Sequence, residues 1–305
     1  MTENQKGHLA AISANIMFGL NMNVCKSLLA SSWMTPLGLI TIRVLSGFIV
    51  FWIIGFFMPR EKTTLRDLAI ILATAFLGLL MSQGVFNLGL SLASPVTMSL
   101  IASLNPIVVL LLSVLFSIES ITPSKVIGVI IGISGASLVV LNNRNSVSFS
   151  GNLLGILLAL VSVICYSSHI LIIRKLAGKL RPITMMKWMY LWAILLLSPI
   201  GLSELSKQRL FSRETALLPI LQIAYTIVFA SIISFFLMPV ALKRVKASSV
   251  SLYMYLQPIA ASTAAIIAGQ DVFSWDKPLA LILIVSGVFI ASLNIRRSRL
   301  KGNVK

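Results

Sequence analysis

Two amide–proline pairs, Asn105-Pro106 and Gln257-Pro258, lie about halfway along long apolar segments. A proline inside a helix removes one backbone hydrogen bond and crowds the carbonyl four residues earlier. In lipid, such a freed carbonyl must face protein or a polar cavity. An amide beside each break can bind a polar solute or join neighbouring helices, and the sequence leaves both roles open. We expect the two pairs to mark a central site.

Three more polar side chains flank these breaks. Ser99 shares a helical face with Pro106, where a small hydroxyl residue can line a cavity or permit close helix packing. Tyr253 and Tyr255 precede Gln257, and a tyrosine hydroxyl at mid-membrane requires a polar partner. A cavity would supply that partner, so all three side chains are candidate substrate contacts.

Lys26 and Arg43 are cations inside apolar segments, at about the same predicted depth. Charged side chains at such depths are costly and usually functional. Either cation could bind a carboxylate or phosphate of a solute. Alternatively, both could extend to the lipid headgroups, and Arg43 could serve structure or gating by bonding to neighbouring carbonyls.

Other polar or aromatic side chains complete the candidate set. Gln83 and Asn87 lie one helical turn apart and therefore share a face. Tyr166 and His169 form a similar pair, in which the histidine either relays protons or makes an interhelical hydrogen bond. The remaining candidates are Asn21 and Trp188.

The predicted interior lacks an acidic group. The eight carboxylates outside the centres of the apolar segments are Glu3, Glu61, Asp67, Glu119, Glu204, Glu214, Asp271 and Asp276. Many proton-coupled carriers depend on a buried Asp or Glu, so we expect uniport or solute exchange unless His169 carries protons. The basic, acid-free interior favours an amino acid or an anionic metabolite over a cationic drug. No phosphate loop, metal-ligand cluster or nucleophile–base pair is present, and we expect neither cofactor nor metal.

The elements that must position these side chains are membrane spans. The chain is 57% apolar and 11% charged, with a mean hydropathy of +0.97. A span needs about 20 apolar residues to cross about 30 Å. We predict an all-α integral membrane protein with ten transmembrane helices. Their expected ranges are 8–29, 36–58, 67–90, 96–118, 124–141, 152–174, 182–203, 216–242, 247–268 and 276–295.

The chain contains an internal duplication. Residues 88–142 can be laid over 240–294 at a constant offset of 152 without a gap, which superposes the two amide–proline pairs. Duplication within a bundle of spans is typical of transporters, whose halves rock around a site between them. Since five spans is an odd number, the second copy enters the membrane upside down. We expect two inverted five-helix repeats, 1–145 and 146–305.

Basic residues predict the orientation. If the N-terminus is cytoplasmic, 17 Lys and Arg fall on the cytoplasmic side and five on the other, so both termini are expected in the cytoplasm. Basic loops facing anionic headgroups account for most of the net charge of +17. The sequence shows no soluble basic surface with aromatic platforms, and nucleic acid is not an expected partner.

The chain resembles the EamA-type members of the drug/metabolite transporter superfamily over about residues 7–296. The motifs that carry the resemblance are Phe18-Gly19-Leu20-Asn21, Pro36 followed by Arg43, Ala93-Ser94-Pro95 leading to Asn105-Pro106, and Lys246-Ala247-Ser248-Ser249 leading to Gln257-Pro258. An acid after each broken span and a glycine-rich fifth span complete it. The resemblance implies a central cavity lined by spans 1, 3, 4, 6, 8 and 9, and it implies export. It does not fix the substrate, because members of the superfamily move amino acids, other metabolites, nucleotide-like compounds and drugs.

We therefore predict a secondary transporter that moves a small polar or zwitterionic, amino acid-like metabolite by alternating access. A flippase for a lipid-linked carrier is the alternative, and a membrane-embedded enzyme or sensor is a third. The expected location is the cell membrane, crossed many times, and the inner membrane if the source is bacterial. The expected partners are the solute and the lipid bilayer. Gly128, Gly132, Gly135 and Gly287 could join the fifth and tenth spans or form a homodimer.

Overall fold

The computed structural model describes the chain in several ranges with gaps between them. The described residues are 2–116, 122–142, 149–212, 216–245, 250, 253–270, 273–275, 277–287, 289 and 290. The regular elements of these residues are all helices. The expected boundary between the repeats, at 145 and 146, and the basic C-terminal tail lie outside the described residues.

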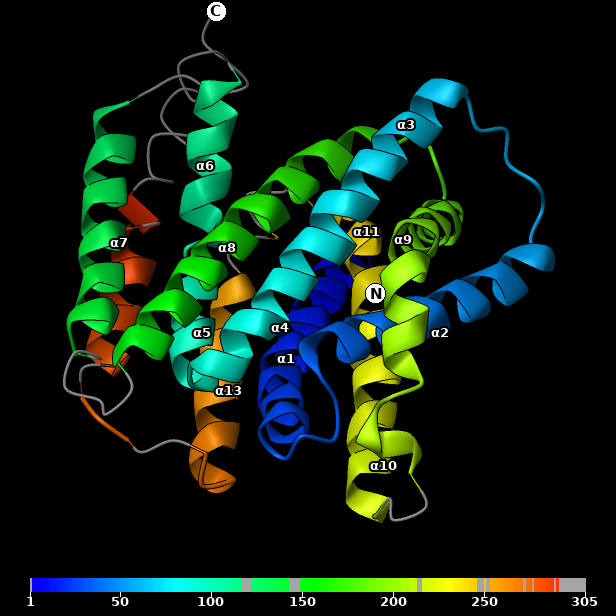
Figure 1. Ribbon diagram of the computed structural model, residues 1–305. Helices are drawn as coiled ribbons and strands as arrows, with labels where there is room; N and C mark the ends of the chain where they lie inside the picture. Colours follow the sequence, from blue (N-terminus) through cyan, green and yellow to red (C-terminus); the bar gives the residue numbers. More distant parts are fainter. Residues whose placement is uncertain are drawn as a thin grey trace, which may run out of the picture.

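The helices form one bundle whose members cross at various angles (Figure 1). The α-helices are α1 Glu3–Ala30, α2 Pro36–Phe56, α3 Leu65–Thr74, α4 Ser82–Leu92, α5 Pro95–Ala102, α6 Asn105–Leu115, α7 Pro123–Asn142, α8 Phe149–Ala177, α9 Pro182–Leu205, α10 Leu217–Tyr225, α11 Ser234–Arg244 and α13 Leu256–Ile267. A last apolar helix covers Lys277–Gly287. Prolines at or next to the first position begin α2, α5, α6, α7 and α9, where a missing N–H costs little.

Six helices of the described chain are long and apolar enough to cross a membrane. They are Pro36–Phe56, Leu65–Leu92, Pro95–Leu115, Leu153–Ala177, Pro182–Leu205 and Leu217–Arg244. This confirms the predicted multi-pass, all-helical architecture. The full count of ten spans and their sidedness stay predictions. α1 has 28 residues, enough to cross, but it carries three buried asparagines that lower its hydropathy.

Two of the long helices contain a π-helical segment, which the sequence analysis did not predict. Ala75–Met81 joins α3 to α4, and Thr226–Ile233 joins α10 to α11. The offset of 152 carries the first segment onto the second. Such segments are rare and often lie at functional sites. Their recurrence extends the internal duplication to this part of the fold.

The packing of the helices also repeats. α1 packs against α11 and α13, while α8 packs against α4 and α6. Because α1 and α8 are the first helices of the two copies, each copy's first helix contacts the third and fourth spans of the other copy. α2 packs against α9, its counterpart in the second copy. This arrangement is the one that a two-fold relation between the copies produces.

The glycine-rich faces meet inside the chain. A side chain on Gly135 would lie 2.9 Å from the Ala280 carbonyl, and one on Gly287 would lie 2.6 Å from the backbone nitrogen of Gly132. Only residues without a side chain permit this approach of two backbones. Of the two roles considered for these glycines, the structure uses them to join α7 to the Lys277–Gly287 helix. It does not test a homodimer.

Candidate functional site

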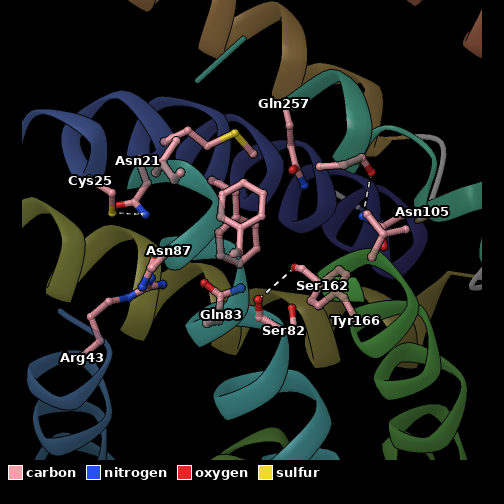
Figure 2. A pocket seen from close by; sticks show the side chains of 16 residues that line it. Asn21, Cys25, Arg43, Ser82, Gln83, Asn87, Asn105, Ser162, Tyr166 and Gln257 are labelled. Carbon is pink, nitrogen blue, oxygen red and sulfur yellow. Dashed lines mark hydrogen bonds between the residues drawn. The ribbon is translucent and has the colours of Figure 1, made fainter. Parts of the chain in front are cut away.

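A polar cavity of about 60 Å³ lies among α1, α2, α4, α5, α6, α8 and α13 (Figure 2). Seven of the thirteen predicted substrate contacts line it, and they come from both halves of the chain. These seven are Asn21, Arg43, Gln83, Asn87, Asn105, Tyr166 and Gln257. Cys25, Ser82 and Ser162 also line it and were not predicted.

Arg43 is the charged side chain among the described residues that line this cavity. It is only 3% exposed, and its Nε donates to Ser231 Oγ at 2.7 Å. Ser231 belongs to the second π-helical segment, and its backbone carbonyl accepts from the Tyr190 hydroxyl. No carboxylate of the described chain pairs with Arg43. A cation held by a neutral hydroxyl in a polar cavity is suited to an anionic group of a solute.

Two amides beside Arg43 have unpartnered polar atoms. Asn87 is 1% exposed and its amide nitrogen has no partner in the described chain. Asn21 is 7% exposed; its nitrogen donates to Cys25 Sγ at 3.2 Å, while its oxygen has no partner there. Buried polar groups without partners are rare and costly. The cavity therefore offers a cation and a donor for a carboxylate, with an acceptor for an ammonium group.

The two predicted helix breaks are present, and their amides anchor helices to each other. α5 ends at Ala102 and α6 begins at Asn105, whose side-chain nitrogen donates to the Ala102 carbonyl at 2.7 Å. The Asn105 side-chain oxygen accepts from Ser167 at 3.1 Å. The carbonyl that Pro106 was expected to free is thus satisfied by the neighbouring amide. Asn105 lines the cavity with both polar groups of its amide occupied.

Gln257 makes the corresponding contact in the second copy. Its nitrogen donates to Asn15 Oδ1 at 2.6 Å. The offset of 152 relates Asn15 to Ser167, just as it relates Asn105 to Gln257. Each broken span is therefore bonded to the first span of the other copy through an equivalent pair. Asn105 and Gln257 were predicted as site residues, whereas their partners Ser167 and Asn15 were not.

Lys26 and Ser99 lie outside the cavity. Lys26 Nζ donates to the carbonyls of Leu90 and Ala93 at 2.9 Å each and to that of Ser91 at 3.3 Å. These carbonyls end α4, where a cation also complements the helix dipole. Ser99 is fully buried and donates to the Val96 carbonyl at 2.8 Å.

His169, Tyr253 and Trp188, which were also predicted to contact the substrate, have partners away from the polar cavity. His169 Nδ1 lies 3.1 Å from the Thr74 carbonyl, at the start of the first π-helical segment. Tyr253 bonds to His8 Nδ1 at 2.8 Å. The ring of Trp188 packs edge-on against Trp52. The predicted residues that the structure does not bring to the cavity are Lys26, Ser99, His169, Trp188, Tyr253 and Tyr255, while Pro106 and Pro258 lie in the helices beside it.

A second, much smaller cavity of about 10 Å³ is related to the first by the duplication. The polar cavity is lined by residues 18, 21, 83, 86, 87 and 90, and the small one by residues 170, 173, 235, 238, 239 and 242, each 152 positions later. Asn21, Gln83 and Asn87 correspond to Ile173, Phe235 and Pro239. At these three positions the first copy supplies polar side chains to its cavity and the second copy supplies apolar ones, while Tyr166 and His169 also line the small cavity.

The fold and the cavity define a multi-pass helical membrane protein with a central polar site between related halves, which is the architecture of a membrane transporter. Among the described residues, no cluster of three or more His, Cys, Asp and Glu side chains could hold a metal ion. The sequence matches the EamA-like transporter family over residues 5–141 and again over 153–293. The chain belongs to this family, as its motifs predicted.

Two relatives bear names of the same class. An uncharacterized transporter of Archaeoglobus fulgidus is 30% identical over 153 residues, which are 50% of this chain and 52% of that protein. The uncharacterized transporter YvbV of Bacillus subtilis is 26% identical over 286 residues, which cover 91% of this chain and 88% of that protein. A crystal structure of another protein covers 96% of this chain and 99% of its own, with a TM-score of 0.65 and 20% identity, and shows a shared fold.

Proposed function

We propose that this protein is a secondary transporter for a small zwitterionic or anionic solute, with an amino acid-like metabolite as the leading class. In this proposal ten spans form two inverted repeats, 1–145 and 146–305, and both termini face the cytoplasm of a cell whose membrane the protein crosses. The expected direction is export. Transport proceeds by uniport or exchange, because no carboxylate lies at a span centre.

The observation that carries the solute class is the chemistry of the polar cavity. Arg43 and the Asn87 nitrogen supply two donors for a carboxylate. The Asn21 oxygen supplies an acceptor for an ammonium group. Without an acidic side chain among the described lining residues, a solute that carries only positive charge would be repelled by Arg43.

The mechanism rests on the two cavities related by the duplication. In an inverted repeat, the counterpart of a pathway open to one side is a pathway to the opposite side. The polar cavity has about 60 Å³ and its counterpart about 10 Å³, which is near the space of a single water. We infer that exchanging the conformations of the two copies would open the small cavity and close the polar one.

Sidedness follows from the predicted orientation. The polar cavity lies toward the C-terminal ends of α1 and α4, which are external if the N-terminus is cytoplasmic. The opposite ends are held together by polar pairs: Lys179 Nζ lies 2.6 Å from Asp67 Oδ2, and Arg244 Nε lies 2.8 Å from Glu3 Oε2. In this proposal the structure is closed on the cytoplasmic side, and these pairs separate when it opens.

The solute class is tested with purified protein in detergent against amino acids, carboxylates and the decarboxylated amine of each amino acid. A ligand that prefers the folded carrier raises the melting temperature. We expect the shift for acids that carry a carboxylate and no shift for the matching amines. Counterflow of the best ligand into proteoliposomes then tests transport. Stabilisation by amines alone would contradict the proposed solute class.

Orientation is tested separately with single cysteines introduced at positions 2 and 304, after Cys25 and Cys165 are replaced by alanine. Both introduced thiols should resist an impermeant maleimide added outside intact cells and react after permeabilisation. If the thiol at one terminus reacted in intact cells while the thiol at the other reacted only after permeabilisation, the two termini would lie on opposite sides of the membrane. That result would contradict the inverted-repeat proposal.

A further inference from the structure

A cavity of about 400 Å³, larger than the central one, lies away from the central site and plays no part in the proposed transport chemistry. It is formed by the end of α2 with the loop that follows it, by the start of α9, and by Phe236 of α11. Cations dominate the charged side chains that line it: Arg60, Arg181 and Lys187 face a single carboxylate, that of Glu61.

The three cations have no carboxylate partner in the described chain. Glu61 Oε2 accepts a hydrogen bond from the backbone nitrogen of Arg181 at 3.0 Å, so the partner of this carboxylate is a backbone N–H group and not one of the three cationic side chains. Lys187 Nζ lies 4.2 Å from the centre of the Trp52 ring, a cation–π contact that positions the ammonium group beside an aromatic surface. A cavity with this excess of positive charge is suited to an anion.

The backbone adds donors to the same cavity. α9 has 24 residues and begins at Pro182, and no side chain caps its first turn. The N–H groups of Ile183 and Thr184 therefore have no partner within the helix, and both residues line the cavity. Uncapped N–H groups and the helix dipole favour a phosphate oxygen at this position.

Two exposed aromatic side chains directly precede the lining residue Met58 in the chain. Phe56 and Phe57 are 83% and 81% exposed and precede Met58, which lines the cavity. Large exposed aromatic side chains beside cations are typical of the interface between hydrocarbon and headgroups. A free phosphate ion would leave these two aromatic rings uncovered, whereas the acyl chains of a lipid would cover them.

We propose that this cavity binds the phosphate group of an anionic glycerolipid, with Arg60, Arg181 and Lys187 around the phosphate and the acyl chains against Phe56 and Phe57. Basic pockets between spans bind such headgroups. Because α2 belongs to the first copy and α9 to the second, the bound lipid bridges the two halves. It therefore stabilises the conformation described above.

The test compares two triple variants of the full chain, each losing three positive charges. The site variant is Arg60→Gln, Arg181→Gln, Lys187→Gln. The control variant is Arg66→Gln, Arg174→Gln, Lys175→Gln, whose cations are exposed, lie on the same predicted membrane side and line no described cavity. Melting temperature and lipids retained in native mass spectrometry are measured with phosphatidylglycerol, phosphatidylcholine and soluble glycerol phosphate.

We expect phosphatidylglycerol at a hundredfold excess over its Kd to raise the melting temperature of the wild type and the control by about 5 °C. The site variant should show no such rise and retain one fewer anionic lipid. If both variants lost the lipid response equally, the lipid would be attracted by the general positive charge of this membrane side. That result would contradict a specific site at the cavity. An equal shift with glycerol phosphate would overturn the lipid in favour of a soluble phosphate ester.

The comparison remains informative if the site variant melts lower without lipid. A second variant, Arg60→Lys, Arg181→Lys, Lys187→Arg, keeps every charge and should retain the lipid response, whereas retention of the response in the Gln variant would refute the proposal. The assay measures lipid binding without transport, so its outcome is independent of the proposed solute.

Discussion

Replacing Arg43 by glutamine tests whether the buried cation serves the solute or the fold. Arg43 is 3% exposed, and its hydrogen-bond partner is a neutral hydroxyl, that of Ser231. Removal of a charge from water is costly unless a counter-ion compensates it. The cation thus lowers the stability of the ligand-free protein, and in the proposed function an anionic solute in the cavity offsets this cost.

Two effects of opposite sign follow. A hydrogen bond to a charged group contributes about 1.5–3 kcal/mol, so loss of the guanidinium should weaken solute binding by about 10- to 150-fold. The ligand-free melting temperature should stay the same or rise, because glutamine removes a buried charge without a counter-ion. If Arg43 served the fold instead, the substitution would lower the melting temperature and leave solute affinity nearly unchanged.

The assay is a thermal-shift titration with the best carboxylate ligand, followed by counterflow in proteoliposomes. Arg43→Lys keeps the charge and should recover part of the affinity. Ser231→Ala removes the neutral partner and keeps the cation, so it should weaken binding far less than Arg43→Gln. A glutamine variant that binds the ligand as tightly as the wild type would refute the assignment of Arg43 to the solute.

Three further predictions concern the framework around the site. Lys26→Met leaves three carbonyls at the end of α4 without their donor, so it should lower the free energy of unfolding by about 1–3 kcal/mol, measured in denaturant, while solute affinity stays unchanged. Gly78→Ala places a methyl group against His169, which should cost about 1–3 kcal/mol, whereas Gly84→Ala has nothing within 4 Å and should be neutral or stabilising. The double-mutant cycle of Asn15→Ala and Gln257→Ala should give a coupling of about 0.5–1.5 kcal/mol, and a cycle of Ser167→Ala and Asn105→Ala should give a similar value if the two contacts are equivalent.

Local signals predicted much of the fold. Apolar length located the helices, since a span must reach across about 30 Å of hydrocarbon. The breaks before Pro106 and Pro258 followed from the missing N–H of proline. Family membership was predicted from short motifs and is confirmed by the match over both halves of the chain.

The partners of individual side chains were beyond local signals. Lys26 donates hydrogen bonds to carbonyls 64 to 67 residues away. Because these acceptors are backbone atoms, the residue types at those positions do not predict them. The π-helical segments shift a hydrogen-bond register, which side-chain periodicity does not reveal. Asn15 was visible as a polar residue, but its pairing with Gln257 depends on how the two copies face each other.

Divergence between the copies explains why one of the two related cavities is the more polar. Asn21, Gln83 and Asn87 line the polar cavity, whereas the equivalent positions in the other copy hold apolar side chains that line the small cavity. In the proposed alternating-access cycle, the solute would meet hydrogen-bonding groups at these positions along one pathway and none at the same positions along the other. In the proposed uniport or exchange, the solute gradient sets the direction, because a carrier without a coupled ion cannot drive net transport against it. We expect the half-saturation concentration to be higher on the side served by the small cavity, measurable as unequal zero-trans kinetics in oriented proteoliposomes.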